Sequence, residues 1–131
     1  MKKLIFAIVG LLVFSSFAQV STLKGTWQYA GGISNGKQYA APDGYTQERK
    51  YTKDKFEAFL IEKGDKPLKY EAGNYSLKND SCFETQTYSL EPSTLTGKTI
   101  HYRYTIKNDT LFLKGKLPNG IEVEDYWKKA K

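Results

Sequence analysis

The residues of this sequence that are best suited to catalysis or ligand binding are two acids, one cysteine and one histidine. Glu84 and Asp125 lie in separate strand-like segments, and two carboxylates that share a cavity can act as acid and base, as in glycoside hydrolysis. Cys82 and His101 are the only residues of their types, so spacing leaves a Cys-His pair open. The sequence contains no Gly-x-Ser-x-Gly elbow, no paired histidines, no CxxC motif and no phosphate loop. We therefore expect a protein that is not an enzyme, with no catalytic residues, no metal site and no cofactor.

Because Cys82 is the only cysteine, the chain can form no intramolecular disulfide. A single cysteine is most often buried as a small apolar side chain, and we expect this for Cys82. An intermolecular link and a reactive thiol remain the two alternatives.

The first eighteen residues have the pattern of a secretory signal peptide. Lys2 and Lys3 precede an apolar run, and Ser16-Phe17-Ala18 offers small residues for cleavage before Gln19. A retained membrane anchor is the alternative, but the apolar run is shorter than the roughly 20 residues needed to cross a bilayer. We expect a signal peptide over residues 1–18, a single domain over residues 19–131, and a periplasmic or secreted protein without a stable membrane anchor.

The charge of the remaining 113 residues is modest. Of the 20 basic side chains two lie in the leader, and the other 18 exceed the 14 acidic ones by four. The lysines are spread along the chain, and no RNP-like or helix-turn-helix pattern is present. We therefore expect no nucleic-acid partner.

The elements that must position these residues are strands. Tyrosine, threonine, phenylalanine and isoleucine dominate, which fit a pleated surface. Short polar separators, of which Asn119-Gly120 is the strongest hairpin signal, make neighbouring strands antiparallel. Two longer breaks cover residues 31–44 and 91–98. Eight strands are predicted, at Thr26 to Gly31, Tyr45 to Thr52, Lys55 to Lys63, Lys69 to Leu77, Cys82 to Leu90, Thr99 to Lys107, Thr110 to Lys116 and Ile121 to Lys128.

The predicted fold is all-β. Eight antiparallel strands in simple order have two exposed edges, and closing the sheet removes both. We predict an eight-stranded antiparallel up-and-down barrel, with a two-sheet sandwich as the alternative. A barrel of this size has an interior wide enough for side chains or for one small ligand.

Four short segments resemble the lipocalin-like domains of small exported bacterial proteins, which are calycin-type barrels whose function is largely unassigned. These segments are Leu23-Lys24-Gly25-Thr26-Trp27, Gly73-Asn74-Tyr75-Ser76-Leu77, Asn108-Asp109-Thr110-Leu111 and Glu124-Asp125-Tyr126-Trp127. The resemblance implies that Trp27 plugs one end of the barrel. It also implies that a basic residue, here Lys128 or Lys129, lies across the Trp27 indole. Any ligand would then enter from the opposite end.

Alternation along the strands predicts which side chains point inward. Ile100, Tyr102, Tyr104 and Ile106 share one face of their strand. If Cys82 and Tyr88 face inward, so do Glu84 and Gln86, although a slip in register would reverse this strand. The predicted ligand-binding residues are Tyr29, Tyr51, Phe56, Tyr75, Glu84, Gln86, Tyr88, Tyr102, Tyr104 and Asp125.

Tyrosine-rich walls with a polar anchor favour a binding protein that takes a small hydrophobic or amphipathic molecule into the barrel. The alternative is a cell-envelope interaction or scaffold protein whose barrel is filled and whose outer surface binds protein or glycan. A cavity of about 300 Å³ or more distinguishes the first from the second.

Overall fold

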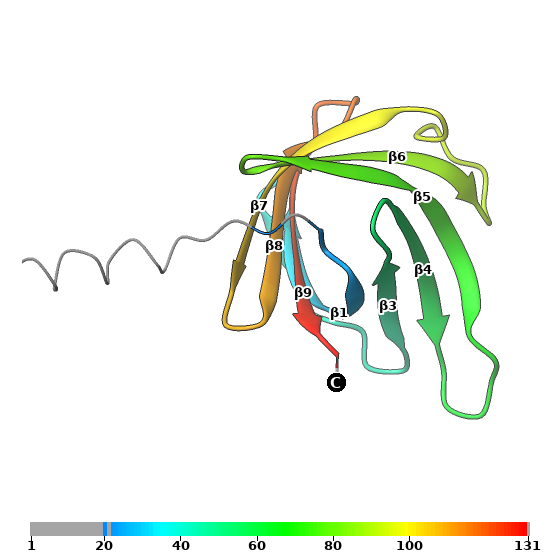
Figure 1. The fold of residues 1–131 in the computed structure, drawn as a ribbon. Helices are drawn as coiled ribbons and strands as arrows, with labels where there is room; N and C mark the ends of the chain where they lie inside the picture. Colours follow the sequence, from blue (N-terminus) through cyan, green and yellow to red (C-terminus); the bar gives the residue numbers. More distant parts are fainter. Residues whose placement is uncertain (1–19, 21, 131) are drawn as a thin grey trace, which may run out of the picture.

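The structure is a computed structural model that describes residues 20 and 22–130, so the predicted signal peptide lies outside the described residues. Within that part of the chain the secondary structure consists of strands joined by turns and loops (Figure 1). None of the described residues forms a helix long and apolar enough to cross a membrane. The strands are β1 (Gly25–Ser34), β2 (Lys37–Tyr39), β3 (Thr46–Tyr51), β4 (Lys55–Ile61), β5 (Leu68–Lys78), β6 (Ser81–Ser89), β7 (Thr99–Lys107), β8 (Thr110–Lys116) and β9 (Glu122–Lys129).

The strands form one antiparallel sheet that closes on itself. From β3 to β9 each strand pairs with the next along the chain, β1 pairs with β3, and β9 pairs back with β1 (Figure 1). This ring of eight strands is the predicted up-and-down barrel, and the sandwich alternative is wrong. Closure leaves neither end of the meander as a free edge.

The short strand β2 was not predicted, although its turn is legible in the sequence. It pairs with the end of β1 through the hairpin Ser34-Asn35-Gly36-Lys37, in which Asn35 and Gly36 have φ of 52° and 81°. Asn-Gly is the preferred pair for a two-residue hairpin turn of this kind, because both central residues need positive φ. β2 lies along the same edge of β1 that β3 occupies nearer the start of β1, within the long break between β1 and β3.

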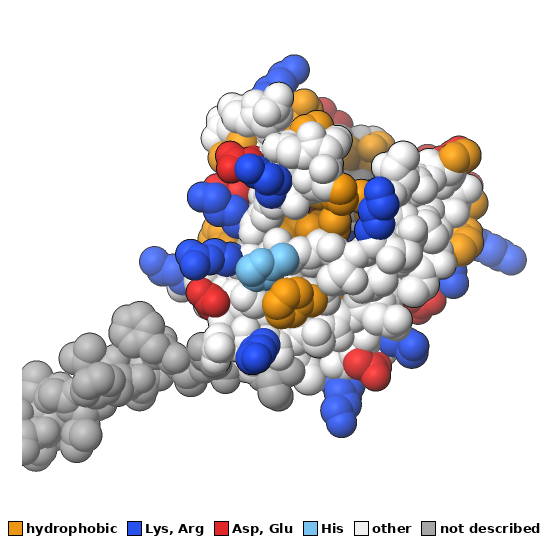
Figure 2. All heavy atoms as spheres, turned by 90° about the horizontal axis from the view of Figure 1, so that it is seen from above, with side chains coloured by type: hydrophobic (Ala, Val, Ile, Leu, Met, Phe, Trp, Pro, Cys, Tyr) orange, Lys and Arg blue, Asp and Glu red, His pale blue; other side chains and the backbone are white. Residues whose placement is uncertain are grey.

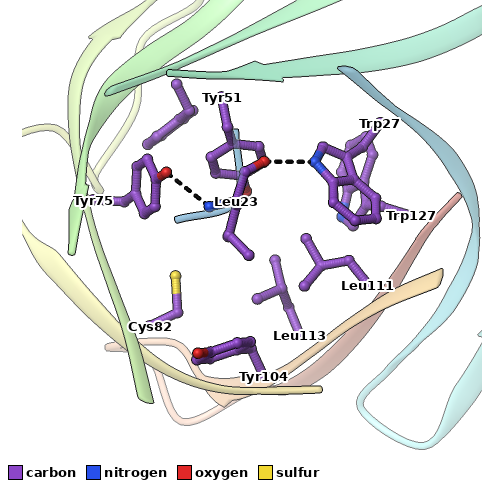
Figure 3. Packing of buried hydrophobic residues seen from close by; sticks show 10 residues of the cluster. Leu23, Trp27, Tyr51, Tyr75, Cys82, Tyr104, Leu111, Leu113 and Trp127 are labelled. Atoms are coloured by element: carbon purple, nitrogen blue, oxygen red, sulfur yellow. Dashed lines mark hydrogen bonds between the residues drawn. The ribbon is translucent and has the colours of Figure 1, made fainter. Parts of the chain in front are cut away.

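One end of the barrel is closed by Leu23 and Trp27, and this end is called the closed end below. Leu23 is 1% exposed and lies among the buried aromatic rings in Figure 3. The Trp27 indole Nε1 donates to the Leu23 carbonyl at 2.8 Å, and the Leu23 amide donates to the Tyr75 hydroxyl at 3.0 Å. Lys129 Nζ lies 5.2 Å from the centroid of the Trp27 ring. The predicted plug is therefore present, and Lys129 rather than Lys128 lies across the indole.

The apolar core fills the half of the lumen next to the closed end. Its inward-facing side chains come from most of the strands around the ring. At one glycine a neighbouring strand and an aromatic ring pack directly against the backbone. At Gly73 a Cβ atom would meet the backbone oxygen of Thr85 and would lie 2.8 Å from the Phe56 ring. The core cluster consists of Leu23, Trp27, Tyr51, Phe56, Tyr75, Cys82, Tyr104, Leu111, Leu113 and Trp127 (Figure 3).

The outer surface carries dispersed charge. In the face shown in Figure 2, lysine and arginine side chains are spread around the molecule and do not gather into one stripe. This distribution matches a solvated surface, as the sequence predicts.

Candidate functional site

A cavity of about 400 Å³ occupies the other half of the lumen. Its walls include Tyr39 and Ala40, which follow the end of β1 that is distant from Trp27, so the cavity lies away from the closed end. The barrel is thus filled on one side and hollow on the other. The cavity is lined by the aromatic residues Tyr29, Tyr39, Tyr70, Tyr102 and Trp127, the polar residues Gln47, Arg49, Glu71 and Asp125, and Ala40 and Pro42.

Arg49 and Glu84 form a buried ion pair at the boundary between the core and the cavity. Arg49 is 8% exposed and Glu84 is 4% exposed. Arg49 Nη1 donates to both carboxylate oxygens of Glu84 at 3.0 Å, and Nη2 donates to Glu71 Oε1 at 3.2 Å. The Tyr51 hydroxyl accepts from Arg49 Nη1 at 2.7 Å and donates to Glu84 Oε2 at 2.8 Å. A buried charge pair is tolerated when its remaining hydrogen-bonding groups are satisfied, and these contacts do so.

The Arg49 guanidinium also contacts aromatic faces. Its Cζ lies 4.4 Å from the Phe56 ring centroid and 5.4 Å from that of Trp127. Burial alone would lower the pKa of Arg49, but the charge of Glu84 and weaker contributions from Tyr51 and Glu71 raise it well above its ordinary value. Arg49 is therefore a fixed positive charge, and it is shared among Glu84, Tyr51 and Glu71.

Glu71 extends this network to the loop between β6 and β7. Gln86 Nε2 donates to Glu71 Oε2 at 2.8 Å, and Thr96 Oγ1 donates to Gln86 Oε1 at 2.8 Å. The Gly97 amide donates to the Gln86 carbonyl at 2.8 Å. The loop is thereby attached to the wall of the barrel beside the cavity.

Asp125 is the carboxylate in the cavity wall that has no ion-pair partner among the described residues. Burial, followed by the charges of Glu84 and Glu71, raises its pKa to about 6, although Arg49 acts in the opposite direction. Burial and the charge of Asp125 also raise the pKa of Tyr29. A Cβ on Gly32 would collide with the backbone oxygen of Glu124 and would lie 3.1 Å from the Tyr29 hydroxyl and 3.2 Å from Asp125 Oδ1, so only glycine fits at this position.

The predicted ligand-binding residues divide among three environments. The residues that line the cavity are Tyr29, Tyr102 and Asp125. Glu84 and Gln86 face inward, as the alternation predicts, but hydrogen bonds hold them in the network beside the cavity. The remaining inward residues do not line the cavity, because the closed-end half of the lumen is filled. They belong to the core, and they are Tyr51, Phe56, Tyr75 and Tyr104.

Tyr88 does not face the lumen, contrary to the prediction. It is 39% exposed, and Lys69 Nζ from the outer ion pair with Glu57 lies 5.3 Å from its ring centroid. The register between β5 and β6 shifts between Ala72 and Gly73, where Thr87 is the additional residue. A bulge of this kind reverses the side of the sheet on which the following residues project.

Sequence reasoning missed four residues of the cavity wall that carry its character. Gln47, Arg49 and Tyr51 occupy every second position of β3 and share its inner face, so the alternation that predicted the other inward residues also predicts them. Glu71 lies two positions before Gly73 in β5, so alternation places both on the same face. Alternation does not predict Tyr70 in the wall, because Tyr70 is the additional residue at a second register shift, between Ala58 and Phe59 of the paired strand β4.

The alternative Cys-His pair is absent. Cys82 is fully buried in the core, as expected, and His101 is exposed on the outer face, where it stacks on Phe83 and lies 2.7 Å from Ser81 Oγ. Burial, followed by the charge of Glu84, raises the pKa of the Cys82 thiol well above its ordinary value. Among the described residues, no group of three or more His, Cys, Asp and Glu side chains could hold a metal ion.

Comparison with known proteins adds little. No family model and no curated protein matches this sequence. Among solved structures, the chain is similar to a mutant of the fluorescent protein UnaG, with 16% sequence identity and a TM-score of 0.43 over 82% of this chain and 96% of that one. A second UnaG mutant shows 13% identity and a TM-score of 0.41 over 83% and 96% of the two chains. Because both TM-scores are below 0.5, the barrel topology rests on the chain's own strand register.

Proposed function

We propose that this protein is an exported, non-catalytic barrel that binds a small amphipathic molecule in the cavity opposite the closed end. The observation that carries the proposal is the cavity itself. Its volume of about 400 Å³ is within the range of about 300 to 1,000 Å³ that is typical of small-molecule sites. Its wall combines aromatic rings with a few polar groups, which suits a ligand with an apolar body and a polar end.

The geometry of the carboxylates supports a binding role without catalysis. Glu84, which would be half of an acid and base pair, does not line the cavity, and Arg49 and Tyr51 occupy both of its oxygens. A general acid or base must reach the reacting atom within hydrogen-bond distance. Export is supported by the leader pattern of residues 1–18, and mass spectrometry of the mature protein tests it by whether the chain begins at Gln19.

Fluorescence titration with the neutral, environment-sensitive dye prodan tests the binding function. We expect saturable binding, with a blue shift of the dye emission as it enters the cavity. Gln47→Trp, which places a large ring in the cavity wall, should weaken binding at least about ten-fold, a loss of about 1.4 kcal/mol. Lys50→Trp is the matched control, because Lys50 lies on the same strand, is exposed and lies over the Phe59 ring outside the barrel.

Absence of saturable binding, or equal weakening by the two variants when both remain folded by circular dichroism, would contradict the proposal. The protein would then fit the alternative of a scaffold that acts through its outer surface.

A further inference from the structure

The charged groups of the cavity are unbalanced. The charged residues in its wall are one cation, Arg49, and two carboxylates, Glu71 and Asp125. A third carboxylate, Glu84, lies directly behind Arg49 and shares its guanidinium. Three carboxylates therefore face one guanidinium, and Asp125 has no ion-pair partner among the described residues.

The charge of Arg49 is already shared by two carboxylates. Its Nη1 is engaged by Glu84 and Tyr51, and its Nη2 donates to Glu71. An anion in the cavity would also approach Glu71 and Asp125, and like charges within one cavity repel each other. The arrangement thus disfavours carboxylates and phosphates as ligands.

The wall next to Asp125 favours a cation for a second reason. The Tyr29 hydroxyl and Asp125 Oδ1 both lie close to Gly32, and Tyr29, Tyr102 and Asp125 line the same cavity. Aromatic faces attract cations, and hydroxyl oxygens accept hydrogen bonds from an ammonium group. Oxygen acceptors and aromatic rings together form a site suited to binding a protonated amine.

We propose that the ligand of this cavity carries a protonated amine that pairs with Asp125, while its apolar body lies against the tyrosines. This inference rests on the proposed binding function and specifies its ligand class. Glu71 adds attraction from the facing strand β5, and Arg49 and Glu84 neutralise each other. Tyr70 and Tyr102 stay neutral at neutral pH, since burial raises the pKa of both.

The pairing predicts a pH dependence of binding. Burial raises the pKa of Asp125 to about 6, and a bound ammonium favours the ionised carboxylate and lowers that pKa. Amine affinity should therefore be constant above about pH 7 and fall several-fold by about pH 5, as Asp125 becomes protonated.

Three probes with one indole body and different charge test the inference. Tryptamine is cationic, tryptophol is neutral and indole-3-acetate is anionic, and each is used to displace prodan from the full-length mature protein at about pH 7.5. We expect tryptamine to displace the dye at a concentration at least about ten-fold lower than tryptophol requires. Indole-3-acetate should be the weakest of the three.

The variant Asp125→Asn assigns the preference to one carboxylate. It should bring tryptamine to within about two-fold of tryptophol. Glu57→Gln is the control, since it removes the same charge from the exposed outer face and should retain the full preference for tryptamine.

If tryptophol or indole-3-acetate binds as tightly as tryptamine, the amine inference is overturned. Prodan binding would still leave the proposed function standing. A preference for tryptamine that persists in Asp125→Asn would overturn the assignment to Asp125. Failure of prodan itself to bind would overturn the proposed function, and the amine inference with it. Because the three-probe comparison uses the unmodified protein, it decides the ligand class even if the variant does not fold.

Discussion

Replacing Asp125 by asparagine should stabilise the barrel at neutral pH. Burial in the cavity wall raises the pKa of Asp125 from 3.8 to about 6, so the ionised carboxylate is less stable in the folded protein than in the unfolded chain. This difference in pKa corresponds to a loss of at most about 3 kcal/mol in the free energy of unfolding. Because the group is only partly buried, we expect a loss of about 1 to 3 kcal/mol. An asparagine side chain at this position would have the same shape without the charge, and it should therefore recover most of this free energy.

The sign of the effect depends on pH. Because the folded pKa is the higher one, the folded protein binds the proton more tightly between about pH 4 and pH 6, and stability falls as pH rises through that window. Below about pH 4 Asp125 is protonated in both states, so the variant and the original protein should unfold alike. Above about pH 6.5 the variant should melt roughly 4 to 12 °C higher, since about 1 kcal/mol shifts the melting temperature of a domain of this size by about 4 °C.

Thermal unfolding followed by circular dichroism at about pH 4, 5.5 and 7.5 measures the effect. Glu124→Gln is the matched control on the neighbouring position of β9, where hydrogen bonds from Tyr126 and Lys114 lower the pKa of the carboxylate. It should cause a small loss of stability that is present at neutral pH and disappears in acid. A melting-temperature difference for Asp125→Asn that is the same at all three pH values, or a loss at neutral pH, would refute the reasoning.

Three further predictions concern the buried ion pair and the core. Glu84→Gln should cost about 3 kcal/mol in urea unfolding, because it leaves Arg49 buried without its main partner, and the double variant with Arg49→Met should cost less than the sum of the single variants; additive costs would contradict the coupling. Gly73→Ala should destabilise by about 3 kcal/mol or more, because its Cβ would meet the Thr85 backbone and the Phe56 ring, whereas Gly44→Ala, with open space around it, should change stability by less than about 1 kcal/mol in the same assay. The Cys82 thiol, which is fully buried and has a raised pKa, should resist Ellman's reagent in the native protein and react in concentrated guanidinium chloride; rapid native reaction would show that the core opens.

The fold was predictable because its information is local. Most strands that follow each other in the ring are joined by a short turn, and residues that accept positive φ mark several of these turns, including Asn79 in the β5–β6 turn and Asn108 and Asp109 in the β7–β8 turn. Antiparallel neighbours in simple order then leave closure as the way to remove both edges. The exception, β2, follows an Asn-Gly turn of the same kind that lies inside a long polar break.

The candidate site was less predictable because it depends on register and on distant partners. Alternation predicted the inward orientation of Tyr102 and Asp125, since β7 and β9 run without a register shift over these positions. It misplaced Tyr88 and missed Tyr70 because bulges change the parity of a strand, and a bulge leaves little trace in the sequence. The partnership of Arg49 with Glu84 joins β3 to β6, a contact that the spacing of residues along the chain does not reveal.

The two buried carboxylates of the lumen point to different roles. Glu84 receives hydrogen bonds from Arg49 and Tyr51 and supports the core, whereas Asp125 has no ion-pair partner among the described residues and weakens the folded state at neutral pH. Natural sequences depart from good packing and pairing chiefly at functional sites. The single substitution Asp125→Asn separates the two explanations of this departure. A gain in stability together with loss of the tryptamine preference would show that Asp125 is retained for its ligand, and the same gain with the preference intact would leave it as an uncompensated charge with no part in binding.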